Sequence, residues 1–186
     1  ASSDPAFDGG PVKEVSLPAA DPLVLGVGGT TLTASHATGA YESETAWNTL
    51  PALPGGHSSA SAGGFSGLSA RPGYQEGIHA AGSTRGVPDA AADAGFNSGM
   101  ALAISDGSQY LLGGATGTSA AAPLWAALIA LADQRAGHDL GFVNPAIYRI
   151  AEGPAYPAAF HDVITGGNTV EDPPVTIPGS ASSPRT

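Results

Sequence analysis

The chain of 186 residues contains no cysteine, so neither a disulfide framework nor a zinc-thiolate site can form. Basic residues are also scarce, since six Lys and Arg stand against sixteen Asp and Glu and give a net charge of −10. This charge repels a phosphate backbone and an anionic membrane, which argues against nucleic acid or membrane as a partner. No apolar run reaches the roughly 20 residues that a membrane-spanning helix needs.

Glycine and proline are abundant, with 27 and 16 residues, and 42% of the chain is hydrophobic. This composition is typical of a globular protein with many tight turns. The length suits one domain, because domains cluster at roughly 100–150 residues. The chain begins with Ala-Ser-Ser rather than Met and carries no signal-like segment, which predicts a processed product or a partial sequence.

Two stretches carry strand signals. Residues 23–27 form a short apolar run, which predicts a buried parallel strand ended by the pair Gly28 and Gly29. Residues 100–112 hold two apolar runs around Ser-Asp-Gly-Ser, which predicts a β-hairpin. Residues 38–82 are rich in Gly, Ser, Ala and Pro with little periodicity, which indicates long loops that could build a cleft.

Two stretches carry helix signals. Residues 118–136 have apolar side chains near helical spacing and stop before Gly137, a typical C-cap residue. A shorter helix is predicted from Asn144, an N-cap type of residue, through about Ile150, with Pro145 at its first position. Residues 1–179 are expected to form the domain and residues 180–186 an unstructured tail.

Ser119 lies at the beginning of the longer predicted helix, within Gly-Thr-Ser-Ala-Ala-Ala-Pro at residues 117–123. Small neighbours let a substrate backbone approach its hydroxyl, and the helix dipole favours negative charge that develops nearby. The alternative is that Thr118 or Ser119 only caps the helix, as Ser and Thr commonly do.

The complete string, continued by Leu-Trp-Ala-Ala-Leu-Ile-Ala-Leu, resembles the nucleophile motif of subtilisin-fold peptidases in the form used by the sedolisins, or serine-carboxyl peptidases. None of the five histidines has the His-Gly-Thr context of ordinary subtilisins. Similar segments follow the family's order at residues 17–30, 61–66 and 85–94. The resemblance implies an α/β fold, a subtilisin-like parallel sheet with helices on both faces, of which this chain supplies an incomplete C-terminal portion.

The resemblance also implies roles for single residues. Ser119 would be the nucleophile, and Asp4 the protonated acid that donates a hydrogen bond in the oxyanion hole. Gly63, Gly64 and Phe65 would line the substrate cleft, because consecutive glycines let a peptide lie along the backbone. The alternative for the two glycines is an ordinary turn.

Sedolisins pair the serine with a Glu base and an Asp four residues later, which lie on one helix face. No Glu-x-x-x-Asp occurs in this chain, and in the family the pair precedes the acid that Asp4 resembles. A serine hydroxyl without its base is a weak nucleophile, so the isolated chain is expected to be inactive. A non-catalytic peptide-binding remnant is the alternative function.

Residues 160–168 resemble the start of the family's calcium loop, where the Asp162 carboxylate and the Val163 carbonyl would be ligands. Two oxygens fall short of the six to eight that Ca²⁺ takes, so weak or no binding is expected. Asp89 and Asp93 are expected to hold turns near the site. The resemblance further implies secretion and a peptide or protein substrate, and leaves an N-terminal pro-domain open as a second partner.

Overall fold

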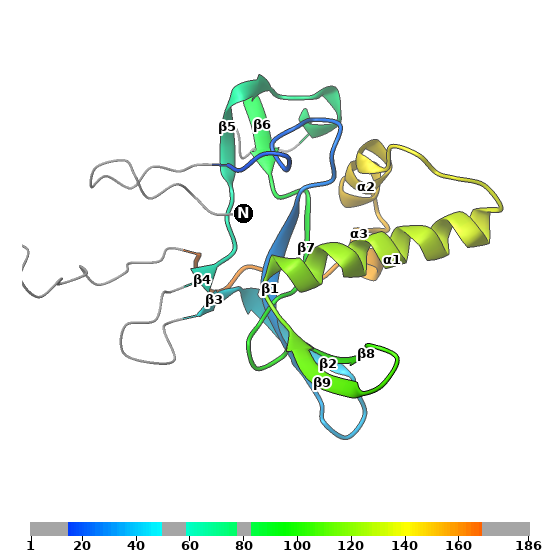
Figure 1. The fold of residues 1–186 in the computed structure, drawn as a ribbon. Coiled ribbons are helices and arrows are strands. Elements are labelled where there is room, and N and C mark those ends of the chain that lie inside the picture. The colour runs from blue at the N-terminus through cyan, green and yellow to red at the C-terminus, as the bar shows by residue number, and fades with distance from the viewer. Residues whose placement is uncertain (1–14, 50–58, 78–82, 169–186) are drawn as a thin grey trace, which may run out of the picture.

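The computed structural model describes residues 15–49, 59–77 and 83–168 (Figure 1). Its central sheet has three strands in the order β2-β1-β7, with bounds Tyr41–Ala46, Val27–Ala34 and Ala90–Asp93. β1 pairs antiparallel with β2 and parallel with β7. Helix α1 (Thr118–Ala136) contacts both β1 and β7, so its N-terminal half lies against the middle of the sheet.

Strand β1 departs from the predicted bounds. It starts at Val27, while Leu23 is 73% exposed, and it runs through the glycine pair that was expected to end it. A Cβ at Gly28 would lie 2.7 Å from the Pro88 side chain, and one at Gly29 would lie 2.7 Å from the Ala94 side chain. The glycines therefore serve close packing inside a strand rather than a turn. The predicted parallel pairing is present, between β1 and β7.

The expectation of irregular loops over residues 38–82 was wrong for much of the described part. Besides β2, this stretch forms three further strands, β3 (Asn48–Thr49), β4 (Ser59–Ala60) and β5 (Gly64–Ala70). It also forms the 3₁₀ helix η1 (Gly73–Gln75). β3 pairs antiparallel with β4, and β5 with β6 (Thr84–Val87). These strands escaped prediction because they are short and rich in small residues, so alternation of polar and apolar side chains is weak.

The hairpin and the helices agree with prediction. β8 (Met100–Ser105) and β9 (Tyr110–Ala115) pair around the Asp106 turn, whose carboxylate accepts from the Gln109 and Ser108 amides. These bonds lower the pKa of Asp106 from 3.8 to about 2. α1 ends at Gly137, which has φ 76°, and the two following helices are α2 (Asn144–Ala151) and α3 (Tyr156–Ala159). No helix within the described ranges has the length and apolar character needed to cross a membrane.

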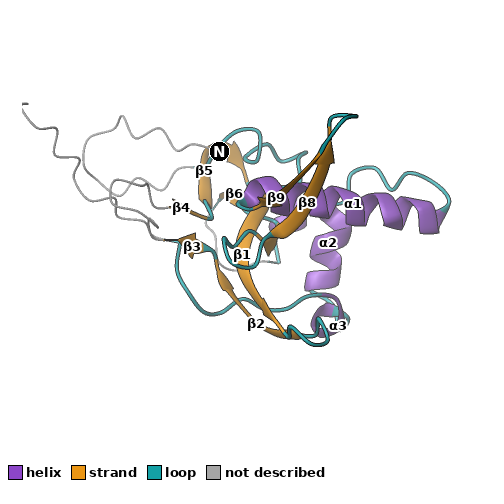
Figure 2. Cartoon of the chain, turned by 60° about the horizontal axis from the view of Figure 1, so that its bottom comes forward, coloured by secondary structure: helices purple, strands orange, loops and turns teal. Residues whose placement is uncertain are grey.

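The described residues bury few large apolar side chains. The buried apolar residues are Ala20, Trp47, Ala94, Ala120, Ala121 and Tyr148. Of these, only Trp47 and Tyr148 have large side chains. By contrast, Leu131 on α1 is 61% exposed, and Ile104 and Leu111, which face each other across the hairpin, are 57% and 62% exposed. Figures 1 and 2 both show the C-terminal turns of α1 projecting past the sheet. Two apolar surfaces, on α1 and on the hairpin, are therefore uncovered among the described residues.

Candidate active site

Ser119 lies in the first turn of α1 with an exposed side chain. The N-cap position belongs to Gly117, which has φ 72°, and no side chain caps the helix. The capping alternative for Thr118 and Ser119 is therefore not what the structure shows. Among the described residues no hydrogen bond occupies the Ser119 hydroxyl, and Ala120 and Ala121 anchor the turn with exposures of 1% and 0%.

Pro123 lies past the first turn of α1 rather than at the helix start. Because proline has no N–H, the Ser119 carbonyl lacks the usual hydrogen bond from the residue four positions later. Ser119 is followed by three alanines, so small side chains flank it within the first turn of α1.

The glycines of β1 connect the start of α1 to the predicted substrate wall. A Cβ at Gly29 would lie 3.4 Å from the Thr118 side chain, so this strand passes directly beside the first turn of α1. A Cβ at the next glycine, Gly28, would meet Pro88 at 2.7 Å, and one at Gly63 would meet the same proline at 3.2 Å. Pro88 therefore lies between β1 and the Gly63 segment.

Gly64 and Phe65 begin β5, where they pair with Val87 and Gly86 of β6. The Gly63 position lies 3.1 Å from the Val87 carbonyl, measured from an added Cβ. The Phe65 side chain is 44% exposed. Gly64 and Phe65 thus lie in a strand whose backbone pairs with β6, rather than in the turn that was the alternative, and Gly63 directly precedes that strand.

Asp4, the residue that the resemblance assigns to the oxyanion hole, lies outside the described residues. Asp162 and Val163 lie in the loop after α3, where the Asp162 side chain is exposed. Burial raises the pKa of Tyr156, and the charge of Asp162 and a hydrogen bond to its carboxylate raise it further.

A Ca²⁺ site needs six to eight oxygens, usually with several carboxylates among them. Within the part of the chain that the structure describes, no three His, Asp or Glu side chains come together as a metal site. The described residues around Asp162 and Val163 therefore do not by themselves fit a bound Ca²⁺.

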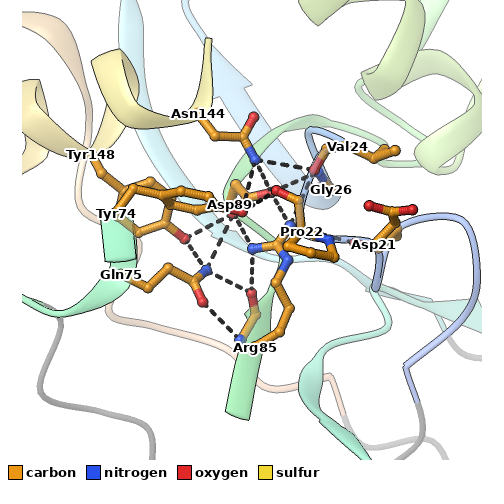
Figure 3. Close-up of polar contacts among 12 residues, drawn as sticks. Asp21, Pro22, Val24, Gly26, Tyr74, Gln75, Arg85, Asp89, Asn144 and Tyr148 are labelled. Carbon is orange, nitrogen blue, oxygen red and sulfur yellow. Dashed lines mark hydrogen bonds and ion pairs between the residues drawn. The ribbon is translucent and has the colours of Figure 1, made fainter. Parts of the chain in front are cut away.

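A buried polar cluster joins residues of β6, η1 and α2 to the segment before β1 (Figure 3). Arg85 is 0% exposed and binds both carboxylate oxygens of Asp89, through Nη1 at 2.5 Å and Nη2 at 2.6 Å. Burial alone would lower the pKa of Arg85, but the hydrogen bonds and charge of Asp89 outweigh it and raise that pKa. The Gly26 amide donates to Asp89 Oδ2 at 2.7 Å, so the ion pair also holds the entrance to β1.

The cluster extends to α2 and η1. Asn144 was expected to cap α2, but Val143 holds that position and the Asn144 amide donates to the Val24 carbonyl at 3.1 Å. The Tyr148 hydroxyl donates to Asp89 at 2.9 Å, and burial raises the pKa of that tyrosine. Gln75 exchanges two hydrogen bonds with the Gly86 backbone, at 2.8 and 3.0 Å. This network fixes β6, the strand on which the Gly64 and Phe65 segment is paired.

Asp93 has the structural role expected of it. Its Oδ1 accepts from the Leu32 amide at 3.2 Å, from the Gly95 amide at 3.2 Å and from the Ser98 hydroxyl at 2.6 Å. Asp89 likewise serves structure, although it binds an arginine rather than a turn. In the sequence, only the Arg-x-x-x-Asp spacing of Arg85 and Asp89 indicates this cluster. No sequence pattern indicates that Gln75 belongs to it.

Comparison with known proteins decides the family. No family model matches the chain. Kumamolisin from Bacillus sp. (strain MN-32) is 40% identical over 176 residues, covering 91% of this chain and 29% of that protein. Sedolisin from Pseudomonas sp. (strain 101) is 34% identical over 162 residues, covering 87% of this chain and 26% of that protein.

The solved structure of Pseudomonas sedolisin, a serine-carboxyl proteinase complexed with two molecules of pseudo-iodotyrostatin, matches with a TM-score of 0.70 and 34% identity. The chain belongs to the sedolisin family. The match covers 82% of this chain and 39% of that structure, and the chain spans under a third of the curated relatives' length.

Sedolisin-family membership confirms the α/β, subtilisin-like fold class that the resemblance implied. Within the described residues the parallel sheet of that fold is represented by one parallel pair, β1 with β7, and the addition of β2 makes the sheet mixed. The described residues contribute three strands to this sheet. Their other strands form two-stranded antiparallel pairs.

Proposed function

We propose that Ser119 is the nucleophile of an acid-acting serine-carboxyl endopeptidase. One observation carries the proposal: the family's serine motif places an exposed hydroxyl in the first turn of a long helix that no side chain caps. In this position the N-terminal dipole of α1 favours the negative charge that develops on an attacked carbonyl.

The reaction class is acyl transfer. Ser119 Oγ attacks the carbonyl carbon of a peptide bond, its proton passes to a base, and the amine leaves with a proton as the acyl-enzyme forms. Water then hydrolyses the ester and restores the serine. Asp4, when protonated, would donate a hydrogen bond to the oxyanion, and such a role requires acid conditions.

The substrate would be a peptide or protein, since the relatives are peptidases. We assign its backbone to the segment Gly63–Phe65, because the edge of β5 that faces away from β6 has no strand partner among the described residues. Secretion and an N-terminal pro-domain belong to the same proposal and have only the family resemblance behind them.

The proposed base is a Glu and Asp pair that this chain does not contain. The pair would come from the portion of a sedolisin-type domain outside the matched 29% of kumamolisin. The uncovered apolar surfaces of α1 and the hairpin are suited to pack against that portion, because large exposed apolar areas mark interaction surfaces. The isolated chain would accordingly be inactive.

Complementation tests this function. The chain is mixed or co-expressed with the remaining catalytic portion of kumamolisin, here called the complementary segment, and cleavage of a fluorogenic peptide is followed at acid pH. We expect no turnover from the chain alone, turnover from the mixture, and loss of at least a thousandfold with Ser119→Ala, since triad members commonly contribute about 10⁴ or more.

Ser43→Ala, at an exposed position of β2, is the matched control and should leave turnover unchanged. Turnover that survives Ser119→Ala would remove the nucleophile assignment. Turnover by the chain alone, dependent on Ser119, would instead overturn the claim that it is inactive.

The alternative, a peptide-binding remnant, is favoured by one observation: no Glu-x-x-x-Asp occurs in the chain. Titration with pseudo-iodotyrostatin beside the peptide assay separates the two, because a remnant would bind this molecule and yet show no turnover with the complementary segment. The coding sequence upstream of Ala1 gives a second test, since a Glu-x-x-x-Asp helix there supports the enzyme.

A further inference from the structure

Trp47 lies beneath the nucleophile turn. It joins β2 to β3 and is only 8% exposed, which makes it one of the few large apolar side chains that the described residues bury. Its ring atom Cη2 lies 3.6 Å from the position of an added Cβ at Gly117, the N-cap residue of α1. Its atom Cε3 lies 3.1 Å from the same position at Gly29. The indole therefore lies close to both Gly29 of β1 and Gly117 at the start of the helix that carries Ser119.

The indole is held in place from several directions. The Trp47 amide donates to the Gly29 carbonyl at 3.1 Å, and its carbonyl accepts from the Ser61 amide at 3.0 Å. The Ser61 hydroxyl accepts from the Gly29 amide at 2.9 Å, which closes a small ring of bonds. The indole Nε1 donates to the Thr49 hydroxyl at 2.8 Å. Both the backbone and the edge of the ring are thus tied down.

Residues 165–168 cover the backbone on either side of Trp47. The Ala46 amide donates to the Thr165 carbonyl at 3.0 Å, and the Asn48 side chain donates to the Gly167 carbonyl at 3.0 Å. The Asn168 side chain donates to the Ser61 carbonyl at 2.9 Å. This outer segment gives the tryptophan a second layer of support.

Besides the buried Ala120 and Ala121, a few backbone hydrogen bonds hold the start of α1 above the ring. The Gly117 amide donates to the Ala94 carbonyl at 2.7 Å, and the Gly117 carbonyl accepts from Ala120 at 2.9 Å. A glycine with positive φ loses much conformational freedom on folding, so its geometry depends on what packs against it. Of the side chains around Gly117, the one found in contact range of its added Cβ is that of Trp47.

We infer that Trp47 is a positioning residue for Ser119, acting through Gly117 and the first turn of α1. The functional meaning rests on the proposed role of Ser119 as nucleophile. The geometric claim, that Trp47 sets the turn, stands separately. An ordinary core tryptophan would stabilise the whole fold without a particular effect on this turn.

Amide hydrogen exchange on the 186-residue chain distinguishes the two. We compare Trp47→Ala and Trp47→Phe with Trp125→Ala, which removes the chain's other tryptophan. Trp125 is a matched control because it lies on α1 itself, half-buried, with its indole bonded to the Ala91 carbonyl at 3.0 Å. Exchange is read at the Ala120 and Ala121 amides and at β-hairpin amides as a global reference.

In Trp47→Ala we expect exchange at Ala120 and Ala121 to accelerate about tenfold or more beyond the global change, since local opening becomes easier when a packing partner is lost. Trp47→Phe should restore most of the protection, and Trp125→Ala should change the two amides only as much as the reference. Equal changes in Trp47→Ala and Trp125→Ala would overturn the inference.

If Trp47→Ala does not fold, Gly29→Ala replaces it, because the new Cβ would crowd the indole at 3.1 Å and Ala94 at 2.7 Å. The same two amides should then lose protection, and unchanged protection there would overturn the inference. In the complementation assay, Trp47→Phe should lower kcat with little effect on KM. An inactive wild-type mixture would remove the proposed nucleophile role but would leave the exchange result intact.

Discussion

At the scale of single residues, the Arg85 and Asp89 pair is the most demanding feature of this chain. Both side chains are 0% exposed, and a buried charge is tolerated only when its partner and hydrogen bonds are in place. Asp89 receives bonds from an arginine, a tyrosine, an asparagine and the Gly26 amide. One carboxylate thereby joins the entrance of β1, the end of β6 and α2.

Asp89→Asn should lower the free energy of unfolding by about 3–5 kcal/mol, because it leaves a buried guanidinium without its countercharge. Urea denaturation at neutral pH measures the change. Asp139→Asn, at an exposed position, is the control and should stay within about 0.5 kcal/mol of wild type. A loss below about 1 kcal/mol for Asp89→Asn would mean that the pair contributes little net stability.

At the scale of elements, the β8-β9 hairpin leads directly into α1, the helix that carries Ser119, and the hairpin depends on the turn between its strands. A two-stranded ribbon is marginally stable by itself, so the Asp106 bonds to Ser108 and Gln109 matter for its register. The hydrogen bonds that the turn donates to the Asp106 carboxylate lower its pKa to about 2, so the carboxylate stays ionised in mild acid.

The Asp106 carboxyl should titrate with a midpoint of about 2 rather than 3.8 in the folded chain. A group whose pKa is lowered on folding contributes stability above its unfolded pKa and loses it as pH falls through the folded pKa. The turn bonds should therefore persist as pH falls below 3.8 and disappear near 2. Carboxyl-carbon NMR follows the titration, and a midpoint of 3.8 would show that the amide bonds are not formed in solution.

At the scale of the whole molecule, the described residues leave apolar surface uncovered on one helix and one hairpin. Leu128 and Leu131 are 49% and 61% exposed, one turn apart on α1. Exposed residues contribute little to the stability of the chain that carries them. Leu128 and Leu131 would contribute to stability through the residues that they would contact in a complete sedolisin-type domain.

The double variant Leu128→Ser with Leu131→Ser should change the stability of the isolated chain by less than about 1 kcal/mol. Its affinity for the complementary segment should fall by roughly tenfold or more, as apolar interface positions do when truncated. Ala126→Ser, on the opposite side of α1, is the control. Unchanged affinity in analytical ultracentrifugation would show that this helix face is not part of the contact.

The sequence by itself determined the features whose signals are local. The span of α1, its end at Gly137 and the Asp106 hairpin follow from periodicity, a C-cap residue and a turn dipeptide, which act within a few residues of each other. The serine motif likewise identified the family from contiguous residues.

Tertiary structure alone decided the features that join distant segments. Asn144 could be read only as a cap, because the Val24 carbonyl that binds it comes from another part of the chain. Gly28 was read as a strand end, because the proline that crowds it lies on a later segment. The place of Trp47 beneath Gly117 could not be read either. Burial and partner choice depend on contacts across the fold, and a single sequence carries no local record of them.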